Sequence, residues 1–182
     1  EDQLAAVLAV SIGSFRMDSV VPELSRAIKL KKRDLLKVHV CQALGQIGSE
    51  RSRDIVLRAL DDRDEDGQAA AVLALSRIPD GKVVDKIMKK GLGSGLIQVK
   101  AYSCVALGRI GRDLPASETK LRRMIAKTLL EATEGTKRNI YAAMYAALGL
   151  GIMGDMGDDS AESFFKTSLG KKERTKIRAE NG

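Results

Sequence analysis

The fold is decided by the stretch Ala43-Leu44-Gly45-Gln46-Ile47-Gly48, because related copies of it recur along the chain. Related copies read Leu8-Ala9-Val10-Ser11-Ile12-Gly13, Ala74-Leu75-Ser76-Arg77-Ile78-Pro79 and Ala106-Leu107-Gly108-Arg109-Ile110-Gly111. Their closing positions lie 35, 31 and 32 residues apart, and a fifth copy, Ala147-Leu148-Gly149-Leu150-Gly151, follows about 40 residues later. A nearly fixed period of this length is typical of proteins that stack one small structural unit many times.

Each copy is expected to close an amphipathic helix. In the second unit apolar residues recur at spacings of three and four, as one face of an α-helix requires; they are Leu36, Val40, Ala43, Leu44 and Ile47. The closing glycines, Gly13, Gly48 and Gly111, stand where a helix C-terminus favours the left-handed conformation. Small residues inside the copies (Gly45, Ser76, Gly108, Gly149) lower helix propensity. Their recurrence therefore predicts a close approach between neighbouring helices.

A second helix is expected after each copy. The polar turns and apolar spacing place these helices at roughly Val20 to Leu30, Ser52 to Leu60, Lys82 to Lys90, Glu118 to Glu131 and Ser160 to Leu169. Ser52, Asp66 and Asp80 are residues of the kind that cap helix N-termini. With two helices per unit and no strand pattern, the sequence predicts an all-α, right-handed solenoid of about five stacked antiparallel helix pairs.

The chain is expected to form a single repeat domain. Its units fall at about 1–33, 34–65, 66–95, 96–136 and 137–170, followed by a basic tail at 171–182. Because it opens without an initiator Met and reads as helix almost at once, we expect a fragment of a longer chain. The first segment, Leu4–Val10, is apolar nearly all round, whereas terminal repeats need a polar outer face. This predicts either further repeats upstream or self-association through this end.

Composition restricts the class of protein. The hydrophobic share of 44% is normal for a folded chain, and only three prolines interrupt helical stretches. No run of 18 consecutive apolar residues occurs, which excludes a transmembrane helix at the level of sequence. The net charge of +7 is moderate, and solvated helix faces are expected to account for most of the basic runs, with an anionic partner as the alternative.

The repeated copies also resemble a known family. The Ala-Leu-Gly-x-Ile-Gly signature, with Leu36-Lys37 and Val99-Lys100 a few residues before it, is similar to the HEAT-like repeats of the phycobilisome-lyase type over residues 4–170. The resemblance implies that the second helices line the inner, concave surface. Such repeats serve scaffolds, adaptors, chromophore lyases, DNA-alkylation glycosylases and a di-iron hydroxylase alike, so the fold alone specifies no activity.

Residues suited to catalysis or metal binding are scarce. The one histidine, His39, is followed by Val40 and not by Glu, so the paired His-Glu motifs of the hydroxylases are absent. The chain has no Trp, which disfavours the base-stacking site of the glycosylases. One His and two Cys lack the spacing of a metal site. We therefore expect a non-catalytic protein without a metal or other cofactor.

The two cysteines occupy equivalent positions in different units. Cys41 and Cys104 lie two repeats apart, which corresponds to roughly 20 Å at about 10 Å per repeat. A disulfide requires Cα atoms within about 7 Å. Both are expected to be buried free thiols, which favours a reducing compartment such as the cytoplasm.

Basic residues recur on the second helices. An alignment of these helices by their apolar residues gives a column of Arg58, Lys86 and Arg123, with Glu23 and Ser163 at its ends, and Lys89, Lys90 and Lys127 nearby. The column predicts a groove for an acidic peptide or protein segment on the concave face. It is also compatible with a face that simply keeps the solenoid soluble, with a solenoid that binds nucleic acid, and with a chromophore-lyase-like subunit.

Overall fold

The computed structural model describes residues 2–30, 34–62, 64–134, 140–154 and 166. In these ranges the regular elements are all helical. They are α1 (Asp2–Ser14), the 3₁₀ turn η1 (Asp18–Val20), α2 (Val21–Ala27), α3 (Asp34–Ile47), α4 (Glu50–Ala59), α5 (Glu65–Leu75), α6 (Gly81–Lys86), the π-helical turn η2 (Ile87–Gly91), α7 (Ile97–Asp113), α8 (Thr119–Glu134) and α9 (Ile140–Met153). The second helix expected at 160–169 and the tail at 171–182 lie outside the described residues.

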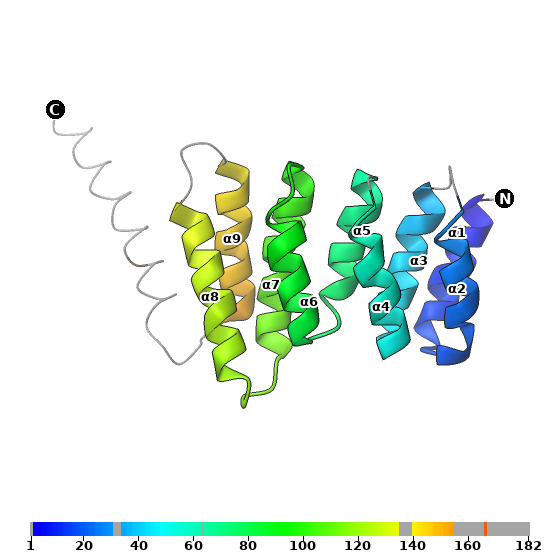
Figure 1. Ribbon diagram of the computed structural model, residues 1–182, viewed down its shortest axis with the longest axis horizontal. Coiled ribbons are helices and arrows are strands. Elements are labelled where there is room, and N and C mark those ends of the chain that lie inside the picture. Colours follow the sequence, from blue (N-terminus) through cyan, green and yellow to red (C-terminus); the bar gives the residue numbers. More distant parts are fainter. Residues whose placement is uncertain (1, 31–33, 63, 135–139, 155–165, 167–182) are drawn as a thin grey trace.

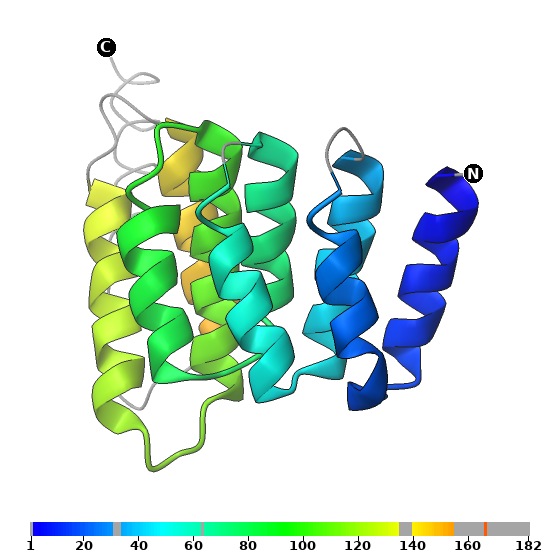
Figure 2. The same ribbon diagram turned by 45° about the vertical axis from the view of Figure 1, so that its right-hand side comes forward.

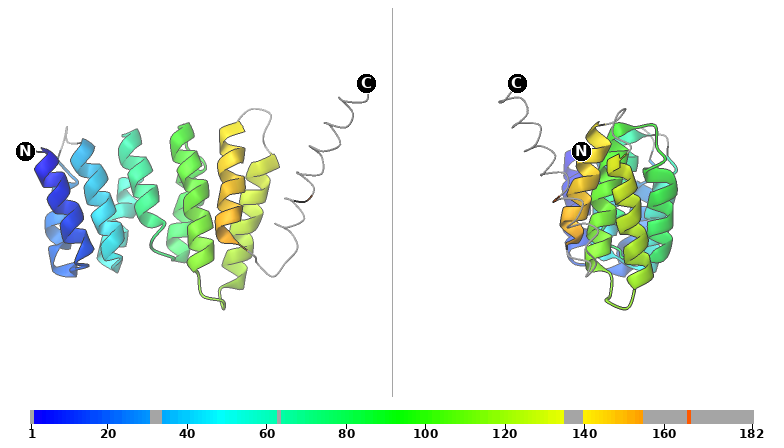
Figure 3. Two further views of the ribbon diagram at one scale, coloured as in Figure 1. Left: turned by 180° about the vertical axis from the view of Figure 1, so that it is seen from behind. Right: turned by 90° about the vertical axis from the view of Figure 1, so that its left-hand side faces the viewer.

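The helices form a two-layered stack, which confirms the predicted all-α solenoid (Figure 1). The first helices of the units, α1, α3, α5, α7 and α9, stand side by side in one layer (Figure 3). The second helices, α2, α4, α6 and α8, form the other layer (Figure 2). None of the described helices has the length and hydrophobicity needed to cross a bilayer.

Contact between units is concentrated in the layer of first helices. Each of α1, α3, α5 and α7 packs along the next first helix, whereas α2 and α4, like α4 and α6, meet at only a few positions. The core is continuous along the stack and is built from small and branched aliphatic side chains; its most deeply buried large members include Leu44, Leu75, Leu107, Ile110 and Leu129. The stack is therefore held together mainly on one side.

The first helices approach one another through small residues, as the sequence predicts. A Cβ atom added at Gly45 would lie 2.8 Å from both the Cα and the carbonyl oxygen of Ala74. One added at Gly108 would collide with the backbone of Gly149. Because the obstructing atoms belong to backbone and cannot rotate away, α3 and α5 need a glycine at this point, and so do α7 and α9.

The prediction for the closing glycines holds at one position and is wrong at two. Gly48 ends α3 with a φ of +69°. Gly13 and Gly111 lie inside α1 and α7, where an added Cβ would be 2.6 Å from the Cα of Ala43 and 2.7 Å from the Cε of Met153 respectively. These two glycines therefore serve helix packing and not helix termination.

Positive φ angles reveal the true register of the first and fifth copies. Arg16 (φ 53°) and Gly154 (φ 74°) each follow the end of a first helix, just as Gly48 does. In this register the first copy is Ser11–Arg16 and the fifth is Gly149–Gly154. The copies quoted from the sequence alone are therefore offset from the structural repeat by three and two residues.

Two helices begin earlier than the sequence predicts, because other residues cap them. Ser49, not Ser52, caps α4, and its Oγ accepts a hydrogen bond from the backbone N–H of Ser52 at 3.2 Å. Likewise Asp64, not Asp66, caps α5 by accepting from the N–H of Gly67 at 2.7 Å. Asp80 caps α6 as predicted, accepting from the N–H of Lys82 at 2.7 Å.

A buried arginine links the second and third units. The side chain of Arg53 on α4 is only 10% exposed, and its Nη1 lies 3.0 Å from Oδ2 of Asp80, the residue that caps α6. Its Nε donates to Oδ1 of Asp54 at 3.2 Å, and Glu50 lies 3.6 Å away. Since α4 and α6 otherwise share few contacts, this ion pair is a principal connection between them.

Candidate binding surface

The inward-facing residues of the second helices define a common register. Each second helix buries several aliphatic side chains, and we align the helices on one buried residue from each of α2, α4, η2 and α8, namely Leu24, Val56, Ile87 and Ile125. A residue two positions later is rotated by about 200° around the helix axis, so it points away from the core. The four residues at that outward position are therefore expected to share one face of the stack.

All four outward positions hold a cation. They are Arg26, Arg58, Lys89 and Lys127, and each is exposed. We refer to these four residues as the outward basic row. The row runs over α2, α4, η2 and α8 and thus follows the whole described length of the second-helix layer (Figure 1).

The row differs in part from the column expected from the sequence. Arg58, Lys89 and Lys127 belong to it, whereas Lys86 and Arg123 lie at other registers, three and four positions before their row members. The difference arises because Ser52 and Arg53 are buried although they are polar, so that apolar residues alone misalign α4. Arg26 is not part of the column expected from sequence, and its equivalence to the other row members appears once burial is known.

Lys86 and Lys90 are engaged in an ion cluster with Asp61. The Nζ of Lys86 donates to Oδ2 of Asp61 at 2.6 Å, and Nζ of Lys90 lies 3.6 Å from Oδ1. The hydrogen bond from Lys86, followed by the charges of both lysines, holds the pKa of Asp61 below its usual value. These two lysines are thereby partly neutralised and are poorer candidates for binding an external anion.

The members of the outward basic row are less constrained. Arg26 lies 3.4 Å from Glu23, and Lys127 lies 3.9 Å from Glu131, in pairs whose side chains are mostly exposed. Such surface pairs contribute little and exchange readily with other partners. Arg58 and Lys89 have no ion-pair partner among the residues that the structure describes. The centre of the row is therefore available to a bound carboxylate.

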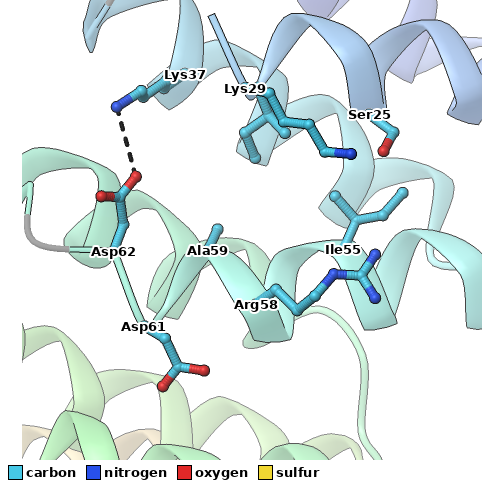
Figure 4. A pocket seen from close by; sticks show the side chains of 9 residues that line it. Ser25, Lys29, Lys37, Ile55, Arg58, Ala59, Asp61 and Asp62 are labelled. Atoms are coloured by element: carbon cyan, nitrogen blue, oxygen red, sulfur yellow. Dashed lines mark hydrogen bonds and ion pairs between the residues drawn. The ribbon is translucent and has the colours of Figure 1, made fainter. Parts of the chain in front are cut away.

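A groove of about 510 Å³ opens between α2 and α4, next to the row (Figure 4). It is lined by Ser25, Ile28, Lys29, Lys37, Ile55, Arg58, Ala59, Asp61 and Asp62. At one side Nζ of Lys37 lies 3.5 Å from Oδ2 of Asp62. At the other side Lys29, from the turn after α2, and Arg58, from α4, reach in close to Ser25 and Ile55.

The groove combines unpaired cations with apolar walls. Neither Lys29 nor Arg58 has a carboxylate partner within the described ranges, while Asp61 and Asp62 are each held by a lysine. Ile28, Ile55 and Ala59 supply apolar surface beside these charges. This combination suits a carboxylate together with a neighbouring aliphatic group, as an acidic peptide would present.

Residues that could support catalysis are not assembled in the described part of the chain. No three His, Cys, Asp or Glu side chains there are grouped so that they could hold a metal ion. His39 is half-buried on α3, and its Nδ1 is enclosed without a hydrogen-bond partner among the described residues.

Both cysteines are free and buried, as predicted. Burial raises the pKa of Cys41 to about 12, although the charge of Lys37 acts in the opposite direction. Burial likewise raises the pKa of Cys104 to about 11. The thiolate is the reactive form of cysteine, so both side chains are protonated and inert at neutral pH.

We expect iodoacetamide to label neither cysteine appreciably in the native protein at pH 8, and to label both quickly in denaturant. The reason is that the two thiols have pKa values far above this pH and are closed off from solvent. Mass spectrometry of timed samples measures the extent of labelling. Rapid native labelling of Cys41 at a rate close to that of a free thiol would contradict its placement in the core.

Comparison with known proteins places the N-terminal part of the stack in a family. Residues 1–76 match the family described as HEAT repeats. This segment consists of HEAT repeats. It spans α1 to α5 and includes the groove, Arg26 and Arg58. A search of curated proteins finds no match to the chain.

The stacking seen in the HEAT-repeat segment continues beyond it. Helix α7 packs against α5 on one side and α9 on the other, and its Gly108 meets Gly149 of α9 as Gly45 of α3 meets Ala74 of α5. HEAT-repeat proteins generally act as protein-interaction scaffolds, and their repeats form extended binding surfaces. The architecture therefore favours protein partners.

Proposed function

We propose that this chain is a non-catalytic protein-interaction scaffold that binds an acidic peptide segment along its second helices. The observation that carries the proposal is the outward basic row, in which four successive second helices place an exposed cation at one register. The HEAT repeats at residues 1–76 support a protein as the partner class.

The spacing of the row suits an extended peptide. Neighbouring helices of a stack lie about 10 Å apart. A peptide in the extended polyproline II conformation advances about 3.1 Å per residue and completes a turn every three residues, so every third side chain points the same way and is about 9 Å from the last. A segment with an acidic residue at every third position can thus meet successive members of the row without distortion.

The groove between α2 and α4 is proposed as the anchor point of this segment. Arg58 belongs to both the row and the groove, and Lys29 reaches into the groove from the turn that follows α2. A carboxylate bound between these two cations gains charge-assisted hydrogen bonds, which are stronger than neutral ones. The apolar walls at Ile28 and Ile55 would receive an adjacent aliphatic side chain.

We also propose that the units beyond residue 76 are HEAT-like repeats of the same kind. The support is the continued register of small residues that face the preceding helix, namely Ala43, Ala74, Ala106 and Gly149. The narrower similarity to repeats of the phycobilisome-lyase type stays a prediction. Absorption in the visible region by the purified protein, from a bound tetrapyrrole, would favour that chromophore-lyase alternative.

Reversing Arg58 and Lys89 together to glutamate should weaken binding of a fluorescent glutamate-rich peptide by about fivefold to thirtyfold. Each lost exposed ion pair is worth about 0.5 to 1 kcal/mol, and 1.4 kcal/mol corresponds to a factor of ten. Fluorescence anisotropy measures the affinity. The wild-type affinity should also fall as salt rises, because exposed charges are screened.

The matched control is the double reversal of Lys82 and Lys120. Both are exposed cations of the second-helix layer that lie off the row, so the net charge changes equally. Equal losses in the two double variants would show that only net charge matters and would defeat the proposal. Tighter binding of a single-stranded oligonucleotide of the same charge would instead indicate a nucleic-acid partner.

A further inference from the structure

The first helix carries an apolar face that its own structure leaves uncovered. Leu4 and Leu8 are 65% and 52% exposed, and Ser11 one turn later is exposed as well. In the structural register these residues correspond to Leu36, Val40 and Ala43 of α3, which are 4%, 0% and 0% exposed. The face of α1 is thus composed like the face of a helix in the interior of the stack.

The same positions are buried in the third and fourth units. In α5 they are Gly67, Ala71 and Ala74, and in α7 they are Val99, Ser103 and Ala106. The residue of α3 that corresponds to Ser11 is Ala43, and α1 covers it by placing Gly13 against it. The face of α1 is therefore shaped to receive another first helix that carries a small residue at the position of Gly13.

The far end of the described stack presents such a helix. Met144, Leu148 and Gly151 of α9 correspond to Ala101, Val105 and Gly108 of α7, which are buried beneath α9. Met144 and Leu148 are 61% and 51% exposed, and a Cβ added at Gly151 would meet nothing within 4 Å. The face of α9 thus has the small residue and the apolar neighbours that the face of α1 requires.

We propose that α9 of one copy packs on α1 of a second copy, so that the chains associate head to tail. Gly151 and Ser11 take the places that Gly45 and Ala74 occupy inside the stack, and Leu4, Leu8, Met144 and Leu148 become buried. The two faces differ from each other, so the contact is heterologous and leaves one face of each kind free at the ends. Association therefore proceeds to longer assemblies in which the helical stack runs on from copy to copy.

Charge substitutions on the two faces test this arrangement. We expect the molar mass of the wild-type protein to rise with concentration above the monomer value of 19.7 kDa in sedimentation equilibrium. Leu8→Glu blocks the α1 face, and Met144→Glu blocks the α9 face. Each variant alone should remain a monomer, because its intact face finds only blocked partners. Both sites are exposed, so neither change should disturb folding, which circular dichroism verifies.

An equimolar mixture of the two variants gives the decisive result. The intact α9 face of Leu8→Glu meets the intact α1 face of Met144→Glu, so the mixture should form dimers. No larger assembly should form, because the remaining two faces of each dimer are blocked. Ile97→Glu, which changes an exposed apolar residue at the start of α7, is the control and should associate as the wild type does. A wild-type protein that stays monomeric overturns the proposal. So does a Met144→Glu variant that still dimerises, since that outcome requires contact between two α1 faces.

Discussion

Replacing Gly45 by alanine is expected to destabilise the protein by about 2 kcal/mol or more, although alanine is the better helix former. The new Cβ would lie 2.8 Å from the Cα and carbonyl oxygen of Ala74, so α3 and α5 must move apart. Overpacking of this kind costs about 1 to 3 kcal/mol, and here the whole first-helix contact is strained. Urea unfolding followed by circular dichroism measures the change.

The same substitution at Gly151 is the matched control. Gly151 also lies within a helix, but in the single chain an added Cβ there would meet nothing within 4 Å. Both substitutions are therefore measured in the Met144→Glu background, in which the α9 face does not associate. Alanine should therefore stabilise α9 by about 0.5 to 1 kcal/mol through its higher helix propensity. The two variants should shift the unfolding midpoint in opposite directions. Shifts of equal sign and size would show that close packing between α3 and α5 does not depend on Gly45.

Replacing Asp80 by alanine is expected to lower stability by more than the loss of a helix cap. The cap alone is worth about 1 kcal/mol. The carboxylate of Asp80 accepts a hydrogen bond from the N–H of Lys82 through Oδ1 and pairs with the buried Arg53 through Oδ2, so alanine removes two interactions at once. A buried guanidinium deprived of one partner adds a further penalty. Thermal unfolding should show a clear fall in Tm.

Asp80→Ser separates the two contributions. Serine caps helices as well as aspartate does, but it carries no charge for Arg53. We expect its Tm to lie between those of the wild type and Asp80→Ala. Arg53→Met keeps the aliphatic packing, and combining it with Asp80→Ser should cost less than the sum of the single changes. Strict additivity in this cycle would mean that the ion pair does not join α4 to α6.

The repeat architecture could be predicted because the hydrophobic spacing and the residues of the repeated signature indicate the same helix boundaries in the second, third and fourth units. The register of the first unit could not. Arg16 occupies the position of positive φ that Gly48 fills in the second unit. An alignment of the repeats by their closing glycines therefore places Gly13 at that position in error. In the fifth unit Gly149 and Gly151 offer two registers, and the structure selects one through the positive φ of Gly154 and the contact of Gly149 with the backbone of Cys104 and Gly108.

The binding surface could be predicted only in part, for a similar reason. Alignment by apolar residues assumes that buried positions are apolar. Ser52 and Arg53 violate this rule on α4, because a hydrogen bond from Ser52 to the carbonyl of Ser49 and the pairing of Arg53 with Asp80 satisfy their polar groups. Such compensation depends on three-dimensional contacts that no local pattern contains. Arg58, Lys89 and Lys127 were nevertheless among the residues expected from sequence.

The one-sided contact between units has a mechanical consequence. The first helices form a tightly joined spine, whereas the second helices are tied to one another by few contacts. Bending that spreads the second helices breaks few contacts, whereas bending in the opposite sense must pull apart the closely packed first helices. The stack should therefore bend easily in the direction that spreads the second helices and resist bending in the opposite direction. A segment bound along the second helices would fix its curvature, and thereby the direction in which the ends of the stack point.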